Sequence, residues 1–204
     1  MESRPKGGRR KRHRMREVQM PEDLVVRYCA PTLAGIKTGS LFSCGFTSRE
    51  ELRADIRGLN RTLAPKGLRA VPLRCSGNRA LIYLFRPISL GRDLSHADAA
   101  CLLRRAGYES TKSGHCILRL MERLSRQEDF PHEIGLFLGY PPEDVRGFIE
   151  NGARNFKCQG CWKVYGDEDA AKKRFAQYQK CTAVYCRHWN HGKTIAQLAV
   201  PVLK

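Results

Sequence analysis

Four cysteines in the last quarter of the chain have the residue type expected of a metal site. Cys158 and Cys161 form a C-x-x-C pair, and Cys181 and Cys186 follow it. Four thiolates that converge on one point can hold structural zinc or an iron–sulfur cluster. A C-x-x-C pair can also act alone in redox chemistry.

The predicted elements argue against one shared metal. A helix starting after Asp167 with apolar residues at helical spacing would carry Cys181 and Cys186 about 140° apart around its axis. Cys181 then faces the core, and zinc or iron–sulfur chemistry remains an alternative. The C-x-x-C pair precedes a predicted strand, so it lacks the helix N-terminus that lowers a thiol pKa in thioredoxin-like sites.

A second candidate segment is the stretch from Cys29 to Lys37. It places a thiol (Cys29), a hydroxyl (Thr32) and an amine (Lys37) close together around Pro31 and Gly35. Such groups could surround an anionic ligand or activate a thiolate. The structural alternative is a buried cysteine at a helix end and a lysine in solvent.

The third candidate segment runs from residue 130 to residue 140. His132 and Glu133 could act as acid and base, but Leu136 stands where a zinc metalloprotease needs its second histidine. Helix capping and packing are the structural alternative. Because this segment, with Tyr140, and the stretch around Lys37 both mix Pro, Gly and reactive groups, we expect the two to line one concave site side by side.

The elements that must position these residues alternate between strands and helices. Apolar spacing, capping residues and turn residues predict strands at 40–44, 68–75, 80–85 and 162–165, and helices at 48–63, 95–107, 113–124 and from 167 to about 185. Residues 22–30 are expected to form a short helix or an extended entry that Pro31 interrupts. Two further short helices flank residues 139–142. This order predicts an α+β fold with a small mixed or antiparallel sheet of about four strands and helices on one face, an arrangement similar to the ferredoxin-like fold.

The charge of the chain is strongly positive, with a formal net charge of +17. Residues 1–20 are predicted to be a disordered basic tail, and residues 21–204 a single domain. The run of Lys and Arg in residues 1–16 could bind nucleic acid without sequence preference, although it has no aromatic residue for stacking on bases. Residues 134–150 resemble a helix-turn-helix in outline, but Glu143, Asp144 and Glu150 would face phosphates unfavourably.

The composition also excludes several classes of protein. No apolar run approaches the ~20 residues needed to cross a bilayer, and no apolar stretch of a signal peptide follows the basic start. The chain is cysteine-rich, with nine cysteines in no disulfide-framework pattern, which indicates free thiols in a reducing cytoplasm. Phosphate-binding and nucleophile-elbow glycine motifs are absent from the sequence.

Four literal stretches resemble the signature blocks of an uncharacterised bacterial family, domain of unknown function 3793. They are CAPTLAGIK (29–37), SLFSC (40–44), FPHEIGLFLGYPPEDV (130–145) and GCWKVY (160–165) with the continuation to 182. The resemblance spans residues 21–198 and implies no activity. The sequence thus predicts a cytoplasmic binding or accessory protein with an unknown ligand or protein partner and no membrane association. Two alternatives stay open, a thiol or metal protein of iron or redox metabolism and a nucleic-acid binder, and whether the protein is an enzyme is undecided.

Overall fold

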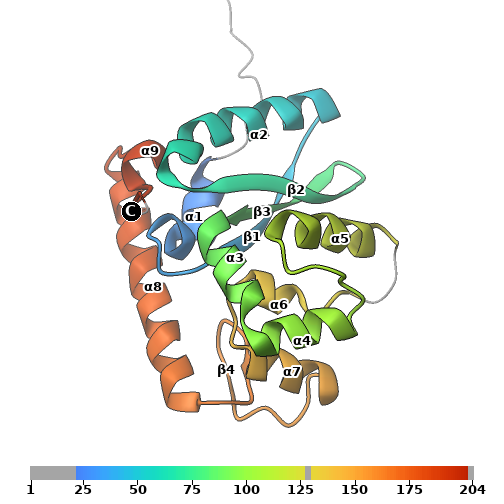
Figure 1. Ribbon diagram of the computed structural model, residues 1–204. Coiled ribbons are helices and arrows are strands. Elements are labelled where there is room, and N and C mark those ends of the chain that lie inside the picture. Colours follow the sequence, from blue (N-terminus) through green and yellow to red (C-terminus); the bar gives the residue numbers. More distant parts are fainter. Residues whose placement is uncertain (1–21, 127–129, 202–204) are drawn as a thin grey trace, which may run out of the picture.

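The computed structural model describes residues 22–126 and 130–201, and within them a three-stranded antiparallel sheet is sandwiched between helices (Figure 1). The strand order is β1-β3-β2. A separate two-stranded hairpin, β4-β5, lies beside the start of the long helix α8. This arrangement confirms the α+β class.

Helices and short strands follow one another along the described residues. They are α1 (Glu22–Leu33), β1 (Gly39–Gly45), α2 (Arg49–Leu63), the 3-10 turn η1 (Ala64–Lys66), β2 (Arg69–Ser76), β3 (Arg79–Phe85), α3 (Pro87–Ser95), α4 (Ala97–Arg105), α5 (Ser113–Ser125), α6 (Ile134–Phe137), α7 (Pro142–Glu150), β4 (Cys158–Gln159), β5 (Lys163–Val164), α8 (Glu168–Asn190) and α9 (Ile195–Leu198).

The sheet carries apolar side chains on both faces because its central strand β3 is apolar from Ala80 to Phe85. Ile82 and Leu84 point into a core formed with α1, α2 and α9, whereas Tyr83 and Phe85 point into a core formed with α3, α4, α5 and α6. Helices therefore cover both faces of the sheet, and the expectation that they lie on one face was wrong. Because successive side chains of a strand point to opposite faces, the unbroken apolar run of β3 requires both faces of the sheet to be covered.

A bulge in β2 corrects a second expectation about the sheet. The pairing of β2 with β3 shifts by one residue between Pro72 and Arg74. As a result Leu73 lies in the core beneath α5, whereas Cys75 packs on the α2 side. The period-two pattern placed both residues on one face, and the extra residue of a bulge reverses that relation.

Two helix predictions also needed correction. The first helix does not stop at Pro31 but continues to Leu33, because a proline in the last turn costs a single backbone hydrogen bond. The segment before residue 95 forms the helix α3, which begins with Pro87 in its first turn. Ser95, expected to start a helix, is instead the last residue of α3, and its hydroxyl donates to the Gly91 carbonyl.

The helices α2 and α8 have the starts that the sequence predicted. The Ser48 hydroxyl accepts from the Glu51 N–H at the start of α2, and the Asp167 carboxylate accepts from the Ala170 N–H at the start of α8. The expected strand after Trp162 is short, and it pairs with β4 rather than joining the main sheet. Together with the first half of α8 it forms a third, small core.

The buried guanidinium of Arg86 joins distant parts of the chain. Arg86 is 2% exposed, and it donates to the carbonyls of Thr32, Leu33 and Val200 at 2.8 Å each. The first two carbonyls end α1 and have no partners within the helix. Arg86 therefore caps the first helix and holds the segment after α9 against it.

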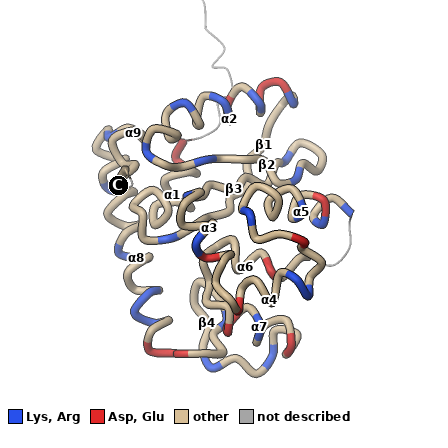
Figure 2. Tube along the Cα trace, viewed as in Figure 1, with Lys and Arg blue, Asp and Glu red and all other residues tan. Residues whose placement is uncertain are grey.

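Charges are unevenly placed along the helices (Figure 2). Acidic residues occupy the first turns of α2 and α8, while Lys and Arg recur farther along both helices. No helix in the described ranges has the length and apolar character to cross a membrane. The predicted disordered tail, residues 1–20, lies outside the described residues.

Candidate functional site: a cleft around Lys37

The loop that carries Lys37 is fixed by hydrogen bonds to the end of α1. The N–H groups of Ile36 and Lys37 both donate to the Pro31 carbonyl, at 3.0 and 3.1 Å. Gly35 adopts a φ of 82°, which an L-residue with a side chain rarely accepts. The chain then enters β1 directly, so Lys37 is held just before the first residue of that strand.

The turn between α6 and α7 brings Tyr140 to the same place. Gly139 has a φ of 73°, and a Cβ on it would lie 2.9 Å from the Thr38 hydroxyl oxygen. The Tyr140 ring stacks on Trp162 with 4.8 Å between centroids, and its hydroxyl donates to the Cys161 carbonyl at 3.2 Å. The segment after α1 and the α6–α7 turn are therefore in direct contact.

A buried carboxylate fixes this aromatic pair. Asp144, 3% exposed, accepts from the Trp162 indole N–H at 2.6 Å and from the backbone N–H groups of Tyr165 and Gly166 at 2.7 Å each. All three donors belong to the hairpin region, whereas Asp144 lies in the first turn of α7. This carboxylate thus clamps the hairpin onto α7 and sets the position of Trp162 behind Tyr140.

The ammonium of Lys37 lies between two tyrosine rings. Its Nζ is 5.4 Å from the centroid of Tyr140 and 5.8 Å from that of Tyr178 on α8. Both distances are within the range of cation–π attraction. Burial lowers the pKa of Lys37, and burial raises the pKa of Tyr140 to about 12. The two phenols stay neutral at physiological pH, so they do not neutralise the ammonium.

These residues open onto a cleft of about 870 Å³, which we call the Lys37 cleft. The loop after α1, the end of α3, the α6–α7 turn and one side of α8 form its walls. Its volume is within the range of small-molecule sites. Its cationic and imidazole side chains are Lys37, Arg92, His96 and Arg174.

Four carboxylates line the cleft, and all but Glu143 already have partners. Asp93 accepts from the Thr38 hydroxyl and pairs with Arg92 at 3.3 Å. Asp144 serves the hairpin, and Asp167 caps α8. Within the described ranges neither Lys37 nor Arg174 has a carboxylate within 4.0 Å. The cleft therefore offers unpaired positive charge beside aromatic rings.

A second, smaller cavity of about 400 Å³ lies behind the aromatic pair, and we call it the aromatic pocket. Tyr140 and Trp162 line both cavities. His132 is exposed at the aromatic pocket and makes an edge-to-face contact with Phe148, 4.9 Å between centroids. His132 thus lies near Tyr140 in sequence and across the aromatic wall from the Lys37 cleft.

Two residues predicted for the site are buried in the fold. Cys29 is fully buried within α1, where burial raises its pKa to about 12, so its thiol is neutral and enclosed. Thr32 is also fully buried, and its hydroxyl bonds to that of Ser40 at 2.9 Å. Neither residue lines the Lys37 cleft.

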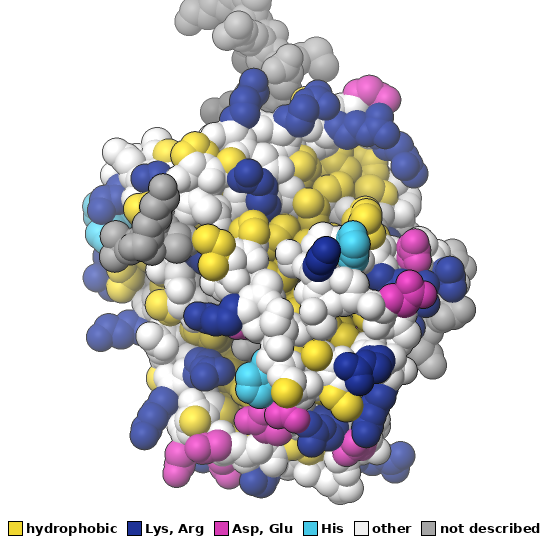
Figure 3. Space-filling model, viewed as in Figure 1, with side chains coloured by type: hydrophobic (Ala, Val, Ile, Leu, Met, Phe, Trp, Pro, Cys, Tyr) yellow, Lys and Arg dark blue, Asp and Glu magenta, His cyan; other side chains and the backbone are white. Residues whose placement is uncertain are grey.

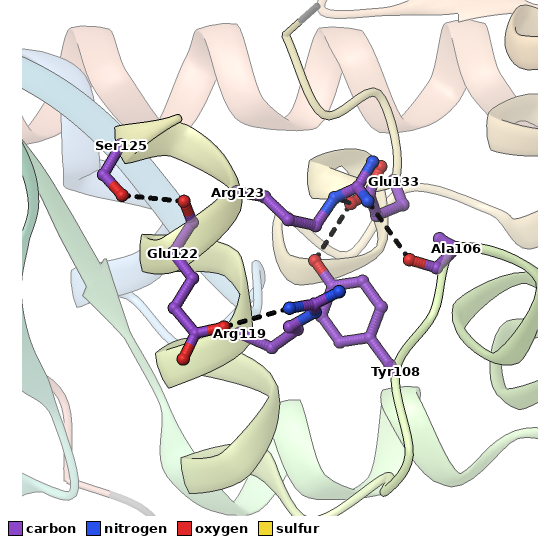
Figure 4. Close-up of polar contacts among 7 residues, drawn as sticks. All are labelled: Ala106, Tyr108, Arg119, Glu122, Arg123, Ser125 and Glu133. Atoms are coloured by element: carbon purple, nitrogen blue, oxygen red, sulfur yellow. Dashed lines mark hydrogen bonds and ion pairs between the residues drawn. The ribbon is translucent and has the colours of Figure 1, made fainter. Parts of the chain in front are cut away.

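Glu133 belongs to a different buried cluster, shown in Figure 4. Its carboxylate, in a residue that is 3% exposed, pairs with Arg123 at 2.7 Å and accepts from the Tyr108 hydroxyl at 3.0 Å. Arg123 also donates to the Ala106 carbonyl at 3.2 Å. The cluster ties the segment before α6 to α5 and to the end of α4, which is a structural use of the carboxylate.

The four C-terminal cysteines do not converge. Cys158 packs on the small core around Phe175, whereas Cys186 packs against the first core, about 16 Å farther along α8 by helix rise. Cys181 is half-buried between these two positions. Among the described residues no three His, Cys, Asp or Glu side chains form a group that could hold a metal ion. Desolvation raises the pKa of Cys161, which is exposed in the turn of the hairpin, and the nearby Lys37 ammonium offsets part of that rise.

Sequence reasoning missed three residues that shape the cleft. The sequence pattern assigns Trp162 to a strand and Tyr178 to an apolar core stripe, and it does not single out Arg174. Tyr178 and Arg174 are four apart on α8 and so share a face of that helix. The sequence therefore shows that Arg174 and Tyr178 share a face of α8. It does not show that this face lies opposite the α6–α7 turn, because that contact is tertiary.

The described residues thus define an α+β protein with a mixed aromatic and cationic cleft. Residues 25–199 match the family described as "Protein of unknown function (DUF3793)", so the chain belongs to this family. No curated protein and no solved structure matches the chain. The match confirms the resemblance noted in the sequence.

Proposed function

We propose that this protein binds a small organic anion in the Lys37 cleft. The observation that carries the proposal is the half-buried Lys37 ammonium, which lies between two neutral phenol rings and has no carboxylate partner within the described residues. A buried charge without a counter-ion is costly, and a bound anion would supply one. Arg174, on α8, lines the same cleft and likewise has no carboxylate within 4.0 Å among the described residues.

The shape of the ligand follows from the other walls. Tyr140, Trp162 and Tyr178 offer aromatic surface next to the cations. A ligand with a planar or apolar part and a carboxylate or phosphate would use both features, because charge-assisted hydrogen bonds fix its anionic end and ring contacts hold the remainder. We infer that the protein acts as a binding or accessory protein in a bacterial cytoplasm, in keeping with nine free cysteines.

The test compares two probes of similar shape and opposite charge. Phenyl phosphate and benzylamine are titrated into the protein by calorimetry at low ionic strength. We expect saturable binding of phenyl phosphate at millimolar or lower concentration and none of benzylamine. Equal binding of both probes, or of neither, contradicts the proposal.

A matched pair of variants assigns the binding to the cleft. Lys37→Gln removes the ammonium between the rings, whereas Lys173→Gln removes the same charge from an exposed position of α8 that does not line the cleft. We expect about tenfold weaker binding of phenyl phosphate in the first variant, equivalent to about 1.4 kcal/mol, and no change in the second. If both variants bind like the unaltered protein, Lys37 is not part of the site.

A further inference from the structure

A groove on another part of the molecule has a different character from the Lys37 cleft. It follows the outer edge of β2, between α2 on one face of the sheet and α5 on the other, and its volume is about 760 Å³. Figure 3 shows it as a hollow of apolar side chains below α2, with Lys and Arg side chains along its upper rim. We call it the arginine groove.

Four arginines give the groove its name. Arg49, Arg53 and Arg57 stand four residues apart on one face of α2, and Arg74 projects from β2. Like charges at this spacing repel one another and weaken a helix. In the part of the chain that the structure describes, none of the four has a carboxylate within 4.0 Å. The lining contains one carboxylate, Glu122, which already pairs with Arg119 at 3.0 Å.

The floor of the groove is apolar. Pro72, Leu73 and Met121 contribute to it, together with the groove-facing sides of Leu52 and Ile56. No aromatic side chain lines it, so nucleic-acid bases would find nothing to stack on. An apolar floor beneath a cationic rim instead suits a protein segment that has apolar and acidic residues.

The exposed edge of β2 is protected against the addition of another strand. The Asn60 side chain donates to the Ala70 carbonyl and accepts from the Ala70 N–H, both at 2.8 Å, so both backbone groups of Ala70 face outward and are occupied. Two residues along, on the same side of the strand, Pro72 has no N–H to offer. An incoming strand would therefore lack the ladder it needs, whereas a helix needs no backbone partners from the groove.

We propose that the arginine groove binds an acidic amphipathic helix of a partner protein. The apolar face of that helix lies on Pro72 and Met121, and its flanking carboxylates pair with the arginines of α2 and with Arg74. Residues 1–16 of the chain itself carry a single acid, Glu2, among many Lys and Arg, so they do not have the charge of this partner. Charge complementarity points to an acidic partner.

The binding test uses a designed probe. A fluorescein-labelled helical peptide of about 18 residues, with Leu on one face and Glu on the other, is titrated by fluorescence anisotropy. The matched probe has Lys in place of Glu, and a third probe is single-stranded RNA of similar length. We expect the Leu/Glu helix to bind and the Leu/Lys helix not to bind. Equal affinity for both helices overturns the proposal.

Two triple variants locate the interaction. Arg53→Gln/Arg57→Gln/Arg74→Gln removes three charges from the groove, and Arg104→Gln/Arg105→Gln/Arg154→Gln removes three from exposed positions outside it. We expect at least about tenfold weaker binding of the Leu/Glu helix in the first variant and at most about twofold in the second, with circular dichroism confirming that both are folded. RNA binding that is lost in the first variant would make nucleic acid the occupant and overturn the proposal.

A direct probe of the groove floor completes the experiment. The chain has four methionines, and Met121 is the one among the described residues, so its methyl group reports on the groove. With ¹³C-methyl methionine labelling, addition of the Leu/Glu helix should shift the Met121 signal. Binding that leaves this signal unchanged would place the helix elsewhere and refute the groove as the site.

Discussion

Replacing Asp144 should loosen the hairpin and the aromatic pair together. Asp144→Ala leaves the indole N–H of Trp162 and the N–H groups of Tyr165 and Gly166 without their acceptor. Each buried donor that loses its partner costs about 1–3 kcal/mol, but the two backbone groups are part-buried and regain some water. We therefore expect a loss of about 3–5 kcal/mol in the free energy of unfolding. Asp144→Asn keeps one acceptor oxygen and should lose about 1–2 kcal/mol.

The assay is urea unfolding, with the midpoint compared at constant slope. Glu150→Gln removes a carboxylate from the exposed end of the same helix and should change the stability by less than about 0.5 kcal/mol. In a Trp189→Phe background, Trp162 is the remaining tryptophan, and its emission should shift to the red when Asp144 is replaced. If Asp144→Ala unfolds like the unaltered protein and the emission of Trp162 does not move, the clamp has no energetic role.

Three further outcomes follow from buried groups and close packing. Glu133→Gln breaks the ion pair with Arg123, which is partly exposed, and should lower the free energy of unfolding by about 2 kcal/mol in urea titrations; an unchanged midpoint would contradict this. Burial raises the pKa of the Cys29 thiol from near 9 in the unfolded chain to about 12 in the folded protein, so its contribution to stability is fully present below pH 9. That contribution should fall by about 1.4 kcal/mol per pH unit above pH 9, and comparing Cys29→Ala with the unaltered protein across this range measures it. Gly147→Ala places a Cβ 2.3 Å from a ring atom of the facing hairpin and should cost about 1–3 kcal/mol, whereas Gly91→Ala meets no atom within 4 Å and should stabilise by about 0.5–1 kcal/mol; thermal melting that ranks the two in the opposite order would refute this.

Local signals in the sequence were sufficient for the elements that they mark directly. The caps Ser48 and Asp167 each provide an oxygen where the first helical N–H groups need one, and both helices start where these residues predict. The strand at 80–85 was predicted from its apolar run, and its two-sided pattern holds in the structure. The helix at 87–95 was missed because its apolar pattern is weak and it begins with a proline, which by itself is also typical of a loop.

The site was harder to predict because it depends on tertiary contacts between distant elements. Lys37 and Tyr140 were singled out, and the structure brings them together, but Cys29 and His132 from the same segments lie elsewhere. The burial of a residue depends on what packs over it, and Cys29 is covered by elements that are distant from it in the sequence. The partners of Lys37 also include Tyr178 on α8, a pairing that no local pattern encodes.

The contact between α1 and α8 has a consequence for the order in which the protein can fold during synthesis. The apolar side chains of Val25, Val26 and Leu33 are at most 1% exposed in the finished fold, and α8 and α9 lie against that first helix (Figure 1). Those covering helices leave the ribosome more than a hundred residues later, a delay of roughly 10–30 s at bacterial rates of translation. Throughout that interval the apolar side of α1 that packs on α8 is exposed to solvent. We therefore expect ribosome-associated chaperones to bind the early part of the nascent chain.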